Sequence, residues 1–309
     1  LEHLVIVGHG GEIISGLVEL YVTVNYALPD KKSVYQDPIH VMLDRILEIG
    51  RNEHGLFYMG VNPQNGEITM EEGISDTFGY IFNSYYTVYM VDSTEAYLEA
   101  IHKALGNLNA YYKSYDWETG SADGYADAIE GTLYLTNRIS ADSSTMNWID
   151  SEIDVMFSMQ DSSHRENGLI YKDSGIIEGW HGDGNFARTA IMYALWKSKG
   201  TYVKPWRKDV MIGAVQTSDN QLKISLTSEK AWEGKLFFDR PRHKTHMQLP
   251  VDYPRLNQLP EWFITRQNTN YVVTFTDGER RVYDGKALQQ GIPVELDAGE
   301  TKFIQITLE

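Results

Sequence analysis

Apolar residues recur at helical spacing along the first part of the chain. In the segment 12–27, Ile13, Leu17 and Leu20 lie three or four residues apart, which places their side chains on one face of a helix. The same spacing returns in later segments bounded by glycine or proline. Pro38 is expected to open one of these helices, since proline is favoured in the first helical turn. The predicted helices span residues 12–27, 38–49, 76–91, 95–113, 125–138, 144–159 and 185–199.

These helices form a weak repeat of helical hairpins. Every second helix starts near residue 11, 75, 124 or 184, a repeat of about 50–64 residues. One hairpin cannot bury its apolar face alone, so neighbouring hairpins are expected to stack with alternate helices inside. Each of the inside helices starts with glycine and polar residues. These starts, at residues 8–12, 73–76, 123–127 and 182–185, are therefore expected to converge on one concave site.

From Trp206 onward, the pattern changes from helical spacing to alternation. In residues 223–227 and 303–307, apolar and polar side chains alternate as in strands with one buried face. Strands are predicted at residues 210–216, 221–228, 235–239, 271–276, 293–296 and 302–308. We therefore expect an α+β chain with two domains, a helical domain at residues 1–205 and an antiparallel β-sandwich at residues 206–309.

A long polar excursion, residues 241–260, interrupts the predicted strands and carries Arg242, His243 and His246. Long loops in compact domains more often have a functional or docking role than serve only as connections. This loop is expected either to reach the rim of the helical domain or to form salt bridges between domains. No metal site is predicted, because the histidines show no metal-ligand spacing on a shared helix. The histidines considered are His9, His181, His243 and His246.

The acidic charge of the chain is concentrated in its helical part. The 309 residues have a net charge of −16 at pH 7, whereas residues 206–309 contain 14 Lys and Arg against 14 Asp and Glu. The whole excess therefore falls on residues 1–205. An acidic surface repels phosphate backbones, which argues against nucleic acid as a partner and favours a neutral or cationic ligand.

The composition excludes several other classes of protein. The chain contains no cysteine, which rules out disulfides, thiolate zinc sites and cysteine nucleophiles. It has no run of 18 apolar residues, so no membrane helix is expected. The opening Leu1-Glu2-His3 shows no signal peptide and is not a natural start, so upstream sequence is expected to have been removed or to lie elsewhere. Motifs for acyl transfer and nucleotide binding are also absent from the sequence.

The segment 178–188 places Trp180, His181 and Arg188 among three glycines at the start of the last predicted helix. Helical hairpins with such starts, followed by a β-domain, resemble the (α/α) toroid carbohydrate-active enzymes, which include six-hairpin glycosidases and polysaccharide lyases. Residues 179–185 look like the Trp- and Gly-rich opening of a late inner helix in glycosidases that act on unsaturated uronides.

This resemblance implies an oligo- or polysaccharide substrate, a periplasmic or extracellular location and no cofactor or membrane partner. It also implies a toroid that is incomplete at its N-terminus, because a complete toroid contains more helices than the seven predicted here. The missing N-terminal half of the toroid would then be a partner of this chain and a possible source of a catalytic residue.

Carboxylates gather at the predicted helix starts. Asp123 and Asp127 are four residues apart and can share a helix face, with Glu130 one turn further on and Asp183 in the last opening. Glycoside hydrolysis needs one protonated carboxyl and one carboxylate, and burial with mutual repulsion can separate their pKa values. Asp123, Asp127, Asp183 and nearby His181 are therefore candidate catalytic residues. The alternative is that Asp123 caps a helix and Asp127 is a solvated first-turn acid.

Aromatic and polar side chains near these acids are candidates for binding sugar. Aromatic faces suit the apolar faces of sugars, although aromatic residues more often belong to the core. The residues expected to line a sugar site are Trp180, Tyr125, Arg188, Tyr80, His9 and Asn185, and Trp148 is a further aromatic candidate.

Two other functions remain open beside a glycoside hydrolase. A polysaccharide lyase acting by β-elimination would use Tyr125 or His181 as its base, with Arg188 neutralising a uronate carboxylate. A non-catalytic glycan-binding or scaffold module would bind sugars without cleaving them.

Overall fold

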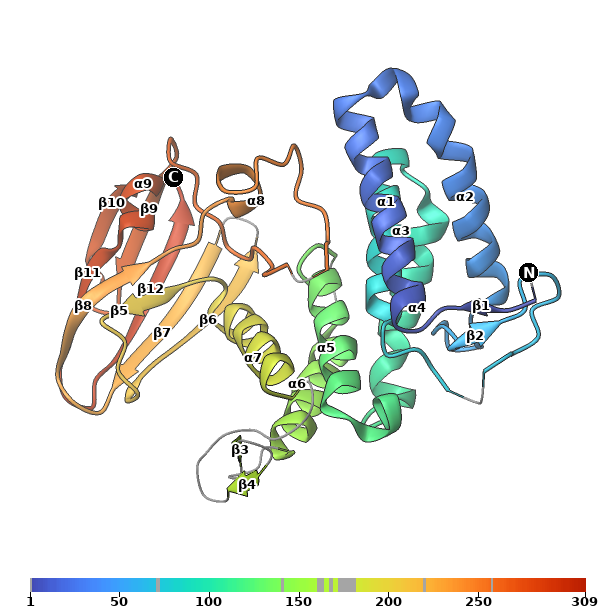
Figure 1. Cartoon of the computed structure of the whole chain (residues 1–309). Helices are drawn as coiled ribbons and strands as arrows, with labels where there is room; N and C mark the ends of the chain where they lie inside the picture. The colour runs from blue at the N-terminus through green and yellow to red at the C-terminus, as the bar shows by residue number, and fades with distance from the viewer. Residues whose placement is uncertain are drawn as a thin grey trace. The chain divides into compact units, whose positions relative to one another are not determined.

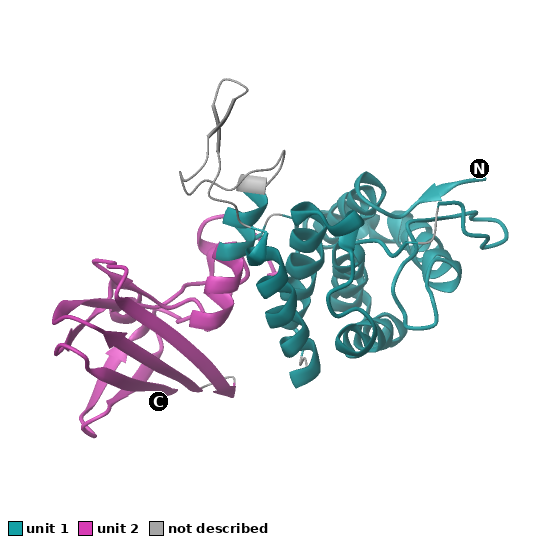
Figure 2. Cartoon of the chain, turned by 90° about the horizontal axis from the view of Figure 1, so that it is seen from below, with its two compact units in different colours: residues 1–190, 253–258 teal, residues 191–252, 259–309 magenta. Residues whose placement is uncertain are grey.

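Two compact units make up the chain (Figure 2): residues 1–190 with 253–258, here called the helical unit, and residues 191–252 with 259–309, here called the sheet unit. The computed structural model describes residues 2–70, 73–139, 142–159, 164–166, 169–171, 182–218, 221–256 and 258–309. Residues 164–166, 169–171, 182 and 183 are described by their backbone alone.

The helical unit is built from consecutive helical hairpins (Figure 1). Its helices are α1 (His9–Ala27), α2 (Lys32–Ile49), α3 (Phe78–Asp92), α4 (Glu95–Tyr111), α5 (Ala122–Thr136), α6 (Ser143–Ser158) and the first part of α7 (Gly182–Ser198). Successive helices pack as the pairs α1–α2, α3–α4 and α5–α6. Helix α3 also packs against both α1 and α5, and α4 packs against α6. The hairpins are therefore stacked, with α1, α3 and α5 side by side.

The predicted helices are all present, but the predicted start of α2 was wrong. Pro38 lies inside this helix, which begins at Lys32 directly after the 3-10 turn η1 (Pro29–Lys31). A proline inside a helix leaves the carbonyl four residues earlier without its N–H donor. That residue is Val34, which is 66% exposed, so the interruption falls on the solvent side. Pro29 begins the turn from which the helix grows, and this is why the helix starts earlier than expected.

Short elements and loops complete the helical unit. They comprise β1 (Leu4–Val5), which pairs antiparallel with β2 (Gly60–Val61), the 3-10 turn η2 (Trp117–Gly120), and the antiparallel pair β3 (His164–Glu166) and β4 (Leu169–Tyr171). Large aromatic side chains fill the core of this unit. Those that are fully buried include Tyr21, Phe57, Phe78, Phe82, Tyr85, Tyr97, Trp117, Tyr134 and Trp148.

The sheet unit contains two antiparallel sheets, with strand orders β10-β9-β12-β7-β6 and β11-β8-β5. The strands are β5 (Tyr202–Lys204), β6 (Val210–Ser218), β7 (Gln221–Ser228), β8 (Trp232–Phe237), β9 (Asn270–Phe275), β10 (Arg280–Asp284), β11 (Ile292–Leu296) and β12 (Thr301–Leu308). Two short helices, α8 (Arg242–Thr245) and α9 (Gly285–Gln290), lie between strands. Central strand β12 pairs with both β7 and β9.

The two sheets share one hydrophobic core, which the alternating pattern predicted in part. Ile224 of β7 and Ile306 of β12 are buried in the same cluster as Leu236 of β8 and Val294 of β11. Strand β10 was not predicted from the sequence, because three of its five residues are charged and their alternation is weak. It lies at the edge of its sheet, where charged side chains prevent further strand pairing.

The chain thus combines helices in its first part with antiparallel sheets in its second. The sequence places the change at Trp206, whereas β5 already pairs with β8 before that residue and the compact units divide after Ala190. Residues 253–258 return to the helical unit, where Arg138 Nη2 donates to Gln258 Oε1 at 3.0 Å. Among the described residues, no helix has both the length and the apolar character needed to cross a membrane.

Candidate active site

Helices α3 and α5 approach each other backbone to backbone, near the start of α3 and in the second half of α5. Gly79 and Gly131 face one another, and a Cβ added to Gly131 would lie 2.6 Å from the Gly79 Cα. Only glycine at both positions permits such a close approach. The contact brings the Tyr80 side chain on α3 beside Asp127 and Glu130 on α5.

Asp127 lies at the centre of a polar cluster. Tyr80 Oη donates to Asp127 Oδ1 at 2.8 Å, and Arg188 Nη2 donates to the same oxygen at 3.3 Å. The side chain of Asp127 keeps 21% of its surface exposed, so solvent can reach it. Burial and the nearby charge of Asp76 raise the pKa of Asp127 to about 8. Asp127 therefore holds a proton near neutral pH.

Glu130, one turn further along α5, anchors Arg188. Its side chain is fully buried and accepts from Arg188 Nε at 2.7 Å and from Thr189 Oγ1 at 2.7 Å. Hydrogen bonds between charged groups are stronger and more directional than neutral ones. Glu130 thus fixes the guanidinium of Arg188 in a position from which it can also contact Asp127.

The starts of α5 and α7 are joined by a further hydrogen bond, in which Asn185 Nδ2 donates to Asp123 Oδ1 at 2.6 Å. Within α7, Arg188 Nη2 donates to Asn185 Oδ1 at 3.3 Å. Two of the glycine-rich helix starts therefore meet, as the hairpin repeat predicted. Asp123 serves here to hold Asn185 and α7 in place.

Asp76 adds a second carboxyl with an altered pKa. It lies just before α3, is buried, and accepts from the Thr77 backbone N–H at 2.8 Å. Burial, followed by the charges of Glu118 and Asp123, raises the pKa of Asp76 to about 6. Asp76 and Asp127 are close enough to interact electrostatically, so the cluster contains two carboxyls that lose their protons at different pH values.

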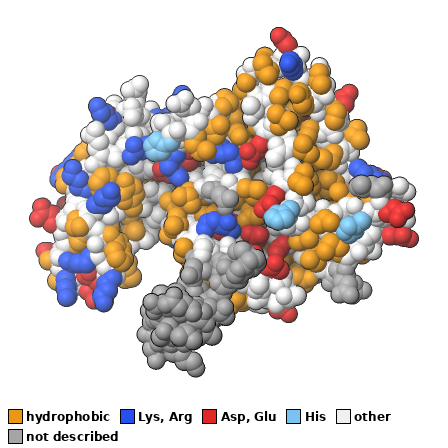
Figure 3. Space-filling model, viewed as in Figure 1, with side chains coloured by type: hydrophobic (Ala, Val, Ile, Leu, Met, Phe, Trp, Pro, Cys, Tyr) orange, Lys and Arg blue, Asp and Glu red, His pale blue; other side chains and the backbone are white. Residues whose placement is uncertain are grey.

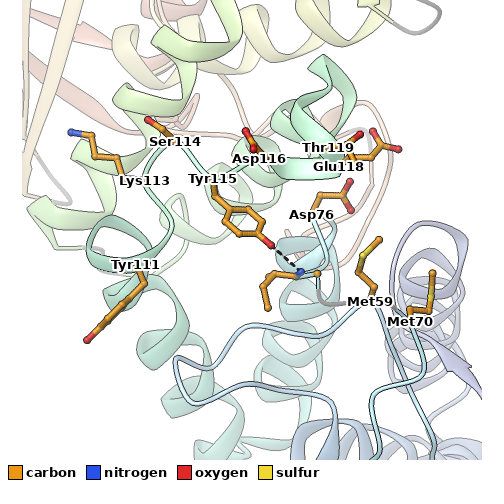
Figure 4. Close-up of a pocket in the computed structure, with 12 residues that line it drawn as sticks. Met59, Met70, Asp76, Tyr111, Lys113, Ser114, Tyr115, Asp116, Glu118 and Thr119 are labelled. Atoms are coloured by element: carbon orange, nitrogen blue, oxygen red, sulfur yellow. Dashed lines mark hydrogen bonds between the residues drawn. The ribbon is translucent and has the colours of Figure 1, made fainter.

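Asp76 also lines a hollow of about 1040 Å³ in the helical unit (Figure 4). Figure 4 shows Asp76 between Tyr115 on one side and Met59 and Met70 on the other. The mixture of apolar, aromatic and charged side chains suits a polar ligand with apolar faces. The lining residues are Met59, Met70, Gly73, Ile74, Asp76, Tyr111, Lys113, Ser114, Tyr115, Asp116, Glu118 and Thr119.

One wall of this hollow, residues 111–119, is held by the buried carboxylate of Glu152. This carboxylate accepts from the Ser114 backbone N–H at 2.7 Å and from Trp117 Nε1 at 3.3 Å. Glu118 and Thr119 have φ angles of 45° and 58°, a left-handed conformation that is costly for side chains of this kind. Such strain persists where the surrounding structure enforces it, and it is frequent at functional sites.

The structure brings together five residues that the sequence singled out for catalysis or binding. The side chains of Tyr80, Asp123, Asp127, Asn185 and Arg188 form one hydrogen-bonded cluster with Glu130. The alternative interpretation of Asp127 as a solvated surface acid does not hold, since it is mostly buried and bonded to Tyr80.

Other candidates lie elsewhere or belong to the core. His9 is at the start of α1, with its side chain 97% exposed and its Nδ1 2.8 Å from Glu12. Trp148 is fully buried and donates from Nε1 to a backbone carbonyl at 2.9 Å, so it packs in the core. Tyr125 is buried, and this burial raises its pKa. Trp180, His181 and the side chain of Asp183 lie outside the described residues.

The sequence did not single out Asp76 as a candidate site residue, nor the wall formed by residues 111–119. Asp76 belongs to a glycine-rich helix start that was recognised, at residues 73–76. Its proximity to Asp127, which lies on another hairpin, is visible only in three dimensions.

Comparison of the sequence with models of known protein families found no match, and no curated protein matches it. The function therefore has to be argued from the chemistry of the site, because a fold alone does not specify an activity.

Proposed function

We propose that this chain is a glycoside hydrolase whose acid is Asp127 and whose base or nucleophile is Asp76. The observation that supports this most directly is that these two carboxyls, from separate hairpins, interact electrostatically, and that Asp76 lines a hollow of about 1040 Å³. Glycosidases act with a pair of carboxyl groups that flank the scissile bond, one protonated and one ionised.

The environments of the two carboxyls suit these roles. With a pKa of about 8, Asp127 can give a proton to the leaving glycosidic oxygen at neutral pH. With a pKa of about 6, Asp76 is ionised and can activate water or attack the anomeric carbon. Arg188, at 3.3 Å from Asp127 Oδ1, would stabilise the carboxylate that Asp127 becomes after it has given up its proton.

The finer architecture fits the same proposal. The stacked hairpins α1–α2, α3–α4 and α5–α6 would be part of an (α/α) toroid, with the helix starts that carry Asp76 and Asp127 directed to its central cavity. The two antiparallel sheets that share one core would form a β-sandwich. An oligo- or polysaccharide substrate would be met in the periplasm or outside the cell.

The outer face of α1 supports the proposal that further helical hairpins complete the toroid. Ile13, Leu17 and Leu20 on this face are 65%, 40% and 47% exposed. Figure 3 shows hydrophobic side chains gathered over α1 and α2. Exposed apolar patches of this kind usually mark an interaction site, and the proposed occupant is the N-terminal half of the toroid.

The environments of Tyr125 and Arg188 favour hydrolysis over β-elimination. A lyase would need a phenol that readily loses its proton, whereas burial raises the pKa of Tyr125. It would also need an arginine directed at a substrate carboxylate, whereas Arg188 is bonded to Glu130 and Asp127.

The test is to incubate the chain with a panel of polysaccharides and to follow products by mass and by ultraviolet absorbance. Asp127→Asn and Asp76→Asn should each lower the cleavage rate about 100-fold or more. Asp154→Asn is the matched control, because Asp154 is an exposed acid on α6. It should cleave at the wild-type rate.

Three results would contradict the proposal. Wild-type rates in both active-site variants would remove the assigned roles of Asp127 and Asp76. An unsaturated, ultraviolet-absorbing product would indicate a lyase. Sugar binding without any cleavage would indicate a glycan-binding or scaffold module.

A further inference from the structure

The polar excursion between β8 and β9 brings three metal-ligating side chains together in the sheet unit. His243 lies in α8, and Asp252 and Glu261 follow at intervals of nine residues. One ligand atom from each of the three lies within 4.8 Å of the other two. In the part of the chain that the structure describes, no other group of three histidine or acidic side chains is arranged in this way.

His243 and Glu261 already have the spacing of two ligands on one ion. The distance from His243 Nδ1 to Glu261 Oε2 is 3.0 Å, and to Oε1 it is 3.2 Å. Bonds from zinc to nitrogen or oxygen are about 2.0–2.2 Å long, which places two ligand atoms of a tetrahedral ion about 3.3 Å apart. An oxygen of Asp252 lies within 4.8 Å of both ligand atoms, so its carboxylate would have to move toward them to become the third ligand.

The burial of Glu261 provides a physical reason for a cation at this place. Its side chain is only 4% exposed, and burying a carboxylate is costly unless it is paired. Glu261 Oε1 also accepts from the His243 backbone N–H at 2.6 Å, which holds the carboxylate in position. Neighbouring Arg242 is engaged elsewhere, since its guanidinium bonds Asp239 and the Pro260 carbonyl.

We propose that His243, Asp252 and Glu261 bind a divalent transition-metal ion, of which Zn²⁺ fits best. Imidazole nitrogen is a preferred ligand of zinc and its neighbours in the first transition row. Calcium and magnesium instead favour oxygen ligands alone. One nitrogen and two carboxylates leave the fourth zinc position to water. This site is separate from the proposed glycosidase site and does not depend on it.

The ion would cross-link the polar excursion. Its ligands come from the start, the middle and the end of the segment 243–261, whose base is closed by the Thr265 N–H, which donates to the Asp239 carbonyl at 2.9 Å. Helix α8 has four residues, too few to be stable by itself. An ion that binds only the folded segment stabilises it in proportion to its concentration and affinity.

The experiment uses the whole chain, freed of metal with a chelator and then titrated with ZnCl₂. Calorimetric titration and elemental analysis should show one Zn²⁺ per chain at this site, and the melting temperature should rise on its addition. Asp252→Asn should weaken zinc binding about tenfold or more. This variant leaves the His243–Glu261 hydrogen bonds in place, so it should fold even if His243→Ala does not.

His246→Ala is the matched control, because His246 is an exposed histidine of the same segment outside the group of three. It should bind zinc as the wild type does. The proposal is overturned if zinc leaves the wild-type melting temperature unchanged, if Asp252→Asn binds zinc with wild-type affinity, or if His246→Ala loses as much affinity as Asp252→Asn. Tighter binding of Ca²⁺ than of Zn²⁺ would overturn the metal class.

Discussion

At the scale of single residues, the protonation of Asp127 depends on neighbours that act in opposite directions. Burial and the charges of Asp76 and Asp123 raise its pKa, while the hydrogen bond from Tyr80 and the charge of Arg188 lower it. These neighbours come from two helix starts besides its own helix. The result is a carboxyl that is protonated at neutral pH yet 21% exposed, as an acid catalyst has to be.

The pH dependence of glycan cleavage follows from these two carboxyls. Activity should rise as Asp76 loses its proton through about pH 6 and fall as Asp127 loses its proton through about pH 8. Tyr80→Phe removes a hydrogen bond to the Asp127 carboxylate, so it should move the alkaline limit to higher pH. Asp123→Asn removes a like charge and should move that limit to lower pH. The measurement is kcat/KM against pH, and shifts of both variants in the same direction would contradict the assignment.

The stability of the chain should also depend on Asp127. Its pKa is about 8 in the folded chain against an ordinary value of 3.8, so the folded state binds more protons between these limits. The stabilising contribution of the bound proton is therefore complete at low pH and lost as the pH rises through about 8.

Asp127→Asn removes the cost of ionising this buried carboxyl. At about pH 9 it should raise the free energy of unfolding by about 1–2 kcal/mol. A pKa difference of one unit corresponds to roughly 1.4 kcal/mol, and the expected gain is smaller than the full difference would give because the side chain of Asp127 is partly exposed to solvent. At about pH 3, below the pKa of both the folded and the unfolded state, the gain should be absent. Urea unfolding at the two pH values measures this. An equal effect at both would show that ionisation of Asp127 is not its source.

At the scale of elements, helix packing depends on a few positions where no side chain fits. Gly131→Ala would push a methyl group into the Gly79 backbone, 2.6 Å from its Cα. Overpacking of this kind costs about 1–3 kcal/mol, against a gain of about 1 kcal/mol in helix propensity. We expect a net loss of about 1–2 kcal/mol in chemical denaturation, with lower activity because Tyr80 moves away from Asp127.

Gly106→Ala provides the matched control for this prediction. Gly106 lies inside α4, and a Cβ added there would meet no neighbouring heavy atom within 4 Å, so alanine should stabilise the chain by up to about 1 kcal/mol. Equal effects of the two substitutions would show that the close approach of α3 and α5 is not what decides the outcome at Gly131.

At the scale of the whole molecule, each unit has a hydrophobic core of its own. Ile101 on α4 is fully buried in the helical unit, and Ile306 on β12 is fully buried in the core of the sheet unit. The whole acidic excess, by contrast, falls on residues 1–205. Both parts of the chain therefore have a buried hydrophobic core, whereas only the first part carries excess negative charge.

Separate cores imply that the units unfold in separate steps. Ile306→Ala and Ile101→Ala should each cost about 2–5 kcal/mol, and each should lower one calorimetric transition while leaving the other in place. A single transition that both substitutions lower equally would show that the units unfold as one.

The sequence was sufficient to locate most helices and strands, because helical spacing and alternation mark the type of element. It did not report which face of α1 is buried, since Ile13, Leu17 and Leu20 are exposed, whereas Ile14, Val18 and Tyr21 are buried. It failed at α2, where a turn at Pro29 starts the helix before Pro38. It also missed β10, a charged edge strand. The start of α2 depends on the turn that precedes it, and β10 depends on its pairing with β9. The spacing of apolar residues within each segment shows neither.

The sequence by itself determined that glycine-rich polar helix starts recur on successive hairpins, and that Asp123, Asp127 and Arg188 are among their residues, because spacing along the chain is a local property. Only the tertiary structure decided which of these side chains meet. It brought Tyr80 to Asp127 through the contact of Gly79 with Gly131, placed Asp76 within electrostatic range of Asp127, and brought His243 to Glu261 across the polar excursion. Burial and nearby charge change the pKa of a carboxyl only at short range, so the chemistry of the site exists only once the hairpins are packed.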